Sequence, residues 1–252
     1  MTEPEAGFET FLRRLALVDE IPMRVGLLCE QLETLPPDRG LALIDESYRR
    51  AALGDPEGQR ALLALGWALF EPRLTHRRAE LGVEARHQGR HHLADFLVPD
   101  LGDEADETPR RVPDFGRGRP LTLGERKSLA RTHDRNLIQR VVRDPHPDVV
   151  RVLLDNPSLT EEEVVRICAM RPNDPDVLRA VHRHRRWVVR YRPRHAIVRN
   201  PDCPLDVALL LVPLLRPADL KETSTASGLA PALRLSCRAI LDQRRGVLET
   251  GD

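Results

Sequence analysis

A chain of 252 residues, 41% of them hydrophobic, is long enough to bury a core as one elongated domain or two small ones. The formal net charge is zero, but residues 1–109 hold 21 acidic and 12 basic residues, whereas residues 110–252 hold 18 acidic and 27 basic ones. This asymmetry indicates two functional faces, or two halves that attract each other.

The sequence predicts neither a secretory signal nor a membrane span. The first ten residues are acidic and have no apolar stretch. The most apolar stretch, 207–215, contains Pro213 and is too short to cross a bilayer. The four cysteines (Cys29, Cys168, Cys203 and Cys237) are too far apart for a zinc knuckle or a CxxC redox motif. We therefore expect a cytoplasmic protein with reduced thiols.

Helical periodicity dominates the first hundred residues, and no segment alternates apolar and polar residues as a strand does. Phe8, Phe11, Leu12 and Leu15 mark a first amphipathic helix. Further helices are separated by proline and glycine, and they begin at N-cap signals such as Asp55-Pro56. We predict an N-terminal helical bundle over residues 1–98.

Residues 99–119 differ in composition from what precedes them. The stretch is rich in acids, then in Pro, Gly and Arg, and has almost no apolar periodicity. This composition predicts a flexible charged linker, in which Val112 and Phe115 are the residues able to dock on a neighbour.

A second domain is predicted over residues 120–252. Thr122 and Glu125 have the spacing of a capping box, which starts a helix at Leu123. Helical periodicity then predicts nine helices, at about 123–132, 134–143, 147–155, 160–170, 174–183, 187–199, 204–215, 217–226 and 230–245.

Two similar short motifs occur in this second half. Asn-Pro-Ser-Leu-Thr at 156–160 and Asn-Pro-Asp-Cys-Pro at 200–204 each follow one helical run and open another. Asn-Pro motifs that recur between short helices are typical of helical-repeat proteins. Such stacked helices expose broad surfaces and mostly serve in binding.

These segments resemble the leucine-rich repeat variant family, a branch of the HEAT-like α-solenoids, over about residues 137–245. The residues that carry the resemblance are Trp187, Val189, Arg190, Ala196, Asn200, Pro201, Pro204 and Val207, and then Asp148, Val149, Val150, Arg151, Leu154, Asn156, Pro157 and Leu159. The resemblance implies a right-handed superhelix of short helices and no catalysis. The cysteine-rich iron–sulfur segment of some members is missing, so we expect no cofactor.

The strongest candidate binding segment is basic and contains aromatic residues. Between residues 177 and 199 it has eight arginines, three histidines and no acid. Such a surface is typical of nucleic-acid binding, but it also suits an acidic protein or a lipid headgroup. The alternative is structural, because the family resemblance implies that Trp packs between helices and Arg reaches helix carbonyls. The candidate partner-binding residues are Arg183, Arg185, Arg186, Trp187, Arg190, Tyr191 and Arg194.

A second, weaker candidate is a metal site at His87, His91 and Asp95. Their spacing of four residues would place the three side chains on one helix face, an arrangement that can hold a divalent ion. Residue 88 is Gln, so the HExxH pattern is absent, and Gly89 weakens a helix between the two histidines. A partly exposed polar helix is the favoured interpretation.

No catalytic motif or phosphate-binding glycine loop is present. The sequence therefore predicts an all-α protein, with an N-terminal bundle and a C-terminal solenoid of HEAT-like repeats. We expect a non-enzymatic cytoplasmic adaptor or scaffold that binds a protein partner through the basic repeat surface. Nucleic-acid binding through the same surface is the second hypothesis, and a metal-dependent enzyme is a distant third.

Overall fold

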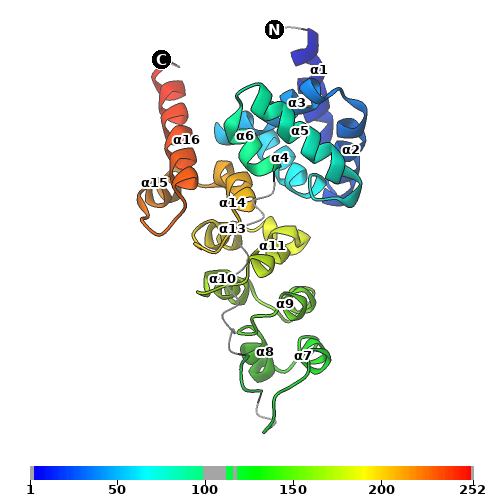
Figure 1. The fold of residues 1–252 in the computed structure, drawn as a ribbon, viewed down its shortest axis with the longest axis vertical. Coiled ribbons are helices and arrows are strands. Elements are labelled where there is room, and N and C mark those ends of the chain that lie inside the picture. Colours follow the sequence, from blue (N-terminus) through cyan, green and yellow to red (C-terminus); the bar gives the residue numbers. More distant parts are fainter. Residues whose placement is uncertain (1–2, 99–111, 116–117, 251–252) are drawn as a thin grey trace. The chain divides into compact units, whose positions relative to one another are not determined.

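The fold is all-helical, as the sequence predicts. A computed structural model describes residues 3–98, 112–115 and 118–250, and within these ranges the regular elements are sixteen α-helices and two short 3-10 helices (Figure 1). The predicted linker 99–119 falls largely outside the described residues. Of the two apolar residues singled out there, Phe115 is buried and Val112 is exposed.

The chain forms two compact units. Unit 1 comprises residues 1–100 together with 205–252, and unit 2 comprises residues 101–204. This differs from the predicted single domain over 120–252, since the last 48 residues belong with the N-terminal helices.

In its described residues, unit 1 has six α-helices from the N-terminal part of the chain and three from the C-terminal part. Its elements are α1 (Glu3–Ala16), α2 (Ile21–Thr34), α3 (Pro37–Ala52), α4 (Pro56–Ala68), η1 (Pro72–Leu74), α5 (Thr75–His87), α6 (His91–Leu97), α14 (Leu205–Leu211), η2 (Val212–Leu214), α15 (Pro217–Thr225) and α16 (Pro231–Thr250). Asp55 caps α4 by accepting hydrogen bonds from the backbone N–H groups of Glu57 and Gly58.

Long-range polar contacts explain why the C-terminal helices belong to unit 1. Arg78 on α5 and Asp206 on α14 form an ion pair of 3.2 Å, and Asp206 is fully buried. Separating this pair would leave a buried charge without compensation, which is strongly unfavourable. Such a contact joins residues 128 positions apart and has no local signature in the sequence.

A second set of contacts holds α16 in place. Its Arg244 donates hydrogen bonds to the backbone carbonyls of Ala52 at the end of α3 and of Pro213 and Leu215 around η2. These carbonyls lie at helix ends, where no intrahelical donor is available to them. The arginine therefore satisfies three of them at once.

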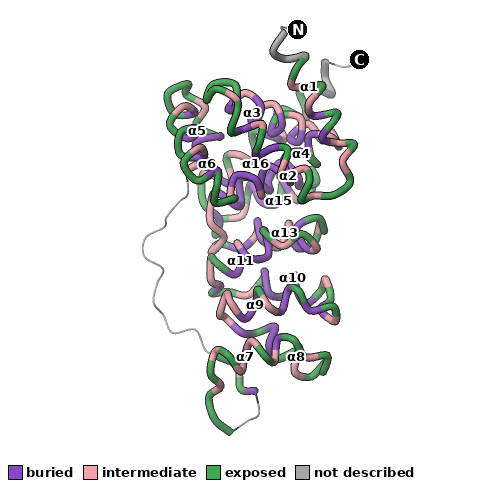
Figure 2. Tube along the Cα trace, turned by 90° about the vertical axis from the view of Figure 1, so that its right-hand side faces the viewer, coloured by how far each residue is buried: buried purple, intermediate pink, exposed green. Residues whose placement is uncertain are grey.

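Unit 2 consists of short helices in two rows. Its elements are α7 (Leu123–Leu129), α8 (Arg135–Val141), α9 (Pro147–Leu154), α10 (Glu161–Ala169), α11 (Pro175–Arg183), α12 (Arg185–Val188) and α13 (Tyr191–Val198). Helices α7, α9 and α11 form one row, and α8, α10 and α13 form the other (Figures 1 and 2). Buried residues gather where the two rows meet (Figure 2).

The predicted helix 187–199 is in fact two helices. Helix α12 ends at Val188, Arg190 has an extended backbone (φ −84°, ψ 136°), and α13 begins at Tyr191. In one continuous helix, Pro193 would lie in the interior, where it lacks an N–H and its ring clashes with the preceding turn. The break places Pro193 in the first turn of α13, where no backbone donor is required.

Candidate functional site

Trp187, a predicted binding residue, is part of the core of unit 2. Its side chain is 1% exposed, and its indole Nε1 donates a 2.9 Å hydrogen bond to the carbonyl of Leu154 at the end of α9. A side chain in this position joins α12 to the end of α9 and cannot stack on a ligand. The assignment of Trp187 to a binding surface is therefore corrected: the residue is structural.

Two of the predicted binding arginines are also used within the fold. Arg186 covers the Trp187 ring at 4.3 Å and donates hydrogen bonds to the carbonyls of Asn156 and Leu159. Arg190 pairs with Glu161 at 2.9 Å. The charge of Arg190 remains exposed, but part of its attraction for a partner is already balanced by this carboxylate.

Tyr191 and Arg194 lie together on α13. The Tyr191 ring stacks on the imidazole of His195, with centroids 6.1 Å apart, and the Arg194 guanidinium lies 5.8 Å from the Tyr191 centroid. Burial lowers the pKa of Arg194. A desolvated guanidinium that packs on an aromatic ring contributes more to folding than to an exposed basic surface.

The exposed arginines of unit 2 come from a wider region than the sequence indicates. Arg183 and Arg185 are exposed, as expected. Arg140, Arg143 and Arg192 are among the exposed arginines that the sequence analysis did not single out. Among the described residues, no hydrogen bond or ion pair engages the side chains of Arg140, Arg143, Arg185 or Arg192. Helical periodicity could have found Arg140, which lies on α8 between the buried residues Ile138 and Val141; Arg143 follows the end of that helix.

The asparagines of the two Asn-Pro motifs have the same structural role. Asn156 Nδ2 donates to the carbonyls of Ala130 and Thr132, which lie just after α7, while its Oδ1 accepts from the N–H of Ser158. The local bond to residue 158 follows from the sequence, because Asn before Pro favours an Asx turn. The bonds to α7 are apparent only in the structure.

Asn200 makes the equivalent bonds in the second half of unit 2. Its Nδ2 donates to the carbonyls of Cys168 and Met170 at the end of α10, and its Oδ1 accepts from the N–H of Asp202. Helices α7 and α10 also begin alike, with capping boxes at Thr122/Glu125 and Thr160/Glu163. The same set of local bonds thus occurs twice in unit 2.

The predicted metal ligands His87, His91 and Asp95 do not share a helix face. Helix α5 ends at His87, Gly89 has a positive φ of 69°, and α6 begins at His91. The glycine allows a left-handed turn that ends the first helix. All three side chains are exposed, and their ligand atoms do not form a potential metal-binding group within the described ranges. The single-helix geometry behind the prediction is wrong.

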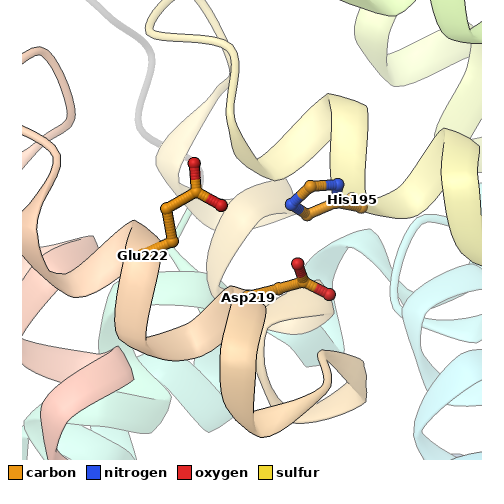
Figure 3. Close-up of side chains that lie close together, drawn as sticks. All are labelled: His195, Asp219 and Glu222. Atoms are coloured by element: carbon orange, nitrogen blue, oxygen red, sulfur yellow. The ribbon is translucent and has the colours of Figure 1, made fainter.

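Figure 3 labels a different set of metal-ligating residue types. Asp219 and Glu222 lie one turn apart on α15, and His195 lies on α13. The two carboxylates belong to unit 1 and the imidazole to unit 2, so we assign no metal site to them.

Comparison with family models, with curated proteins and with solved structures gives no match to this chain. In the part of the chain that the structure describes, no helix combines the length and the apolar composition needed to cross a membrane.

Proposed function

We propose that this chain is a non-catalytic helical-repeat adaptor, and that unit 2 is an α-solenoid segment that binds an acidic stretch of a protein partner. The observation that carries the proposal is the set of four exposed arginines that the fold does not use: Arg140, Arg143, Arg185 and Arg192. Exposed arginines that have no intramolecular partner keep their full charge for an incoming carboxylate.

The repeated bonds of unit 2 support the solenoid part of the proposal. In each half, an asparagine after the last helix binds the carbonyls that end the first helix. The contact between Trp187 and Leu154 then joins the second half to the first. Stacking of similar units through nearest-neighbour contacts is what defines a solenoid. The resemblance to leucine-rich repeat variant proteins is consistent with this arrangement.

A protein partner fits the surface better than a nucleic acid does. Proteins that bind single strands use exposed aromatic rings on which bases stack. Trp187 is buried, and Tyr191 is already stacked on His195. Arginines without a stacking platform suit carboxylates, which they bind through paired hydrogen bonds. The cytoplasmic location is part of the proposal and rests on four free cysteines, three of them buried.

The test compares two labelled probes on the full chain: a Glu-rich peptide and a single-stranded oligonucleotide of equal charge. In fluorescence anisotropy at about 150 mM salt, we expect the peptide to bind more tightly than the oligonucleotide. Replacing Arg140, Arg143, Arg185 and Arg192 together by Gln removes up to about 2 kcal/mol, or about thirtyfold in affinity, if each exposed pair contributes about 0.5 kcal/mol.

The matched control removes the same amount of charge elsewhere. Four exposed arginines of unit 1, replaced together by Gln, should leave peptide affinity within about threefold; these are Arg14, Arg39, Arg60 and Arg86. Equal losses in the two quadruple variants would show that only net charge matters, and the proposed surface would be wrong. Tighter binding of the oligonucleotide would favour nucleic-acid recognition instead.

A further inference from the structure

Unit 1 has a pocket of about 550 Å³ that nothing in the proposed function uses. Four helices line it: α3, α6, α14 and α16. Its volume lies in the range of sites that hold small organic ligands. All of its lining residues belong to unit 1, so the pocket is formed within one compact unit.

The wall of the pocket is mostly apolar. Leu209 and Ile240 are buried in it, and Leu235 on α16 is 62% exposed. The small side chains of Ala232 and Ala239 leave room on the same helix. A large exposed leucine beside buried apolar groups gives a ligand apolar surface to cover, which is the main source of affinity for small molecules.

Two hydroxyl groups in the lining provide a hydrogen-bond donor. Tyr48 on α3 is 7% exposed, and its hydroxyl lies 3.2 Å from Oγ of Ser236 on α16. One of the two hydroxyl hydrogens serves the bond between them. The other has no acceptor among the described residues. Burial raises the pKa of Tyr48 to about 12, so the pair keeps both hydrogens at neutral pH.

The charged groups in the lining argue against an anionic ligand. Arg49 is engaged by Glu46 in a double hydrogen bond. Asp45 pairs with Arg90 at 2.7 Å and with His92 at 3.1 Å. The carboxylate of Asp95 has no hydrogen-bond or ion-pair partner within the described ranges. An anion in the pocket would therefore meet an unbalanced carboxylate.

We propose that this pocket binds an uncharged amphipathic small molecule, whose apolar body lies against Leu235 and Ile240 and whose carbonyl or ether oxygen accepts a hydrogen bond from the Tyr48–Ser236 pair. The site is separate from the arginine surface of unit 2. The proposed ligand site and the proposed adaptor function are therefore tested independently, and failure of one leaves the other unaffected.

The test uses Nile red, an uncharged dye with an apolar body and one carbonyl, and anilinonaphthalene sulfonate, an apolar dye of similar size that carries a negative charge. With the full chain, we expect one saturable Nile red site in a fluorescence titration. Binding of the sulfonate should be at least about tenfold weaker. Equal affinity for the two dyes, or no saturable binding of Nile red, would overturn the proposal.

Two tryptophan variants test whether Nile red binds in this pocket. Ala239 is exposed at the pocket, so Ala239→Trp fills the space without disturbing the core and should weaken Nile red binding by at least about tenfold. Ala79→Trp, at an exposed alanine of α5 outside the pocket, is the matched control and should leave the affinity unchanged. If the two variants behave alike, the dye binds elsewhere and the proposed site is wrong.

The hydroxyl pair makes a sharper prediction. In Tyr48→Phe or Ser236→Ala alone, the remaining hydroxyl is freed to donate, so affinity should change by less than about threefold. The double variant has no donor and should bind about tenfold more weakly. Circular dichroism checks that each variant is folded. A double variant that is folded and binds as tightly as the unchanged protein would refute the role of the pair.

Discussion

Asn156 is the residue whose replacement tests the structure of unit 2 most sharply. Its side chain makes three hydrogen bonds to backbone groups: two from Nδ2 to carbonyls at 2.9 and 2.7 Å, and one to Oδ1 from an N–H at 2.9 Å. The residue is 3% exposed. Leucine has a similar size but can make none of these bonds.

The expected loss follows from the three unsatisfied backbone groups. A typical intramolecular hydrogen bond contributes about 1 kcal/mol net, and a buried group left without a partner costs about 1–3 kcal/mol. Asn156→Leu should therefore lower the free energy of unfolding by about 3 kcal/mol. Asn200→Leu removes an equivalent set of bonds and should cost a similar amount.

The assay is urea unfolding followed by circular dichroism, with native-state hydrogen exchange to separate the units. Asn136→Leu is the matched control, because Asn136 is exposed on α8 and its side chain has no partner within the described ranges. The control should change stability by less than about 0.5 kcal/mol. If Asn156→Leu costs no more than the control, the asparagine bonds do not hold the helices of unit 2 together.

Two further predictions concern the segment 184–187. Trp187→Ala should destabilise unit 2 by about 3–5 kcal/mol, since it removes a buried aromatic side chain and its bond to Leu154; a melting temperature close to that of the unchanged protein would contradict its place in the core. His184 Nδ1 caps α12 by accepting from the N–H of Arg186, and burial lowers its pKa despite the nearby Asp155. The unfolded state therefore binds the proton more readily, so this contribution is complete above about pH 6.5 and is lost as the pH falls through the lowered folded value. His184→Asn keeps a capping acceptor and should flatten the loss of thermal stability on acidification; parallel pH profiles for the two proteins would refute this.

Local signals in the sequence predicted the helices well. The capping box at Thr122/Glu125 and the proline start at Asp55-Pro56 have short-range physical causes, and the observed helices begin within a residue or two of them. The helical spacing of Trp187 and Tyr191 predicts one continuous helix over 187–199, but the observed chain breaks between them, which keeps Pro193 out of a helix interior.

Long-range contacts could not be read from the sequence. The Arg78–Asp206 pair places the C-terminal helices in unit 1, and no pattern links residues so far apart. The hydroxyl pair of the pocket, Tyr48 and Ser236, spans 188 positions. The sequence spacing of an aromatic residue among arginines does not distinguish a binding surface from a core position. For Trp187, the hydrogen bond to the carbonyl of Leu154 shows that the residue lies in the core.

Hydrogen exchange of the full chain with and without the Glu-rich peptide tests the proposed adaptor surface most directly. We predict slower amide exchange on peptide binding in α8 and in α12–α13, the helices that carry or adjoin Arg140, Arg143, Arg185 and Arg192, with no change in α2 to α5. Protection confined to unit 1, or none at a peptide concentration that saturates the anisotropy signal, would contradict the assignment of binding to unit 2.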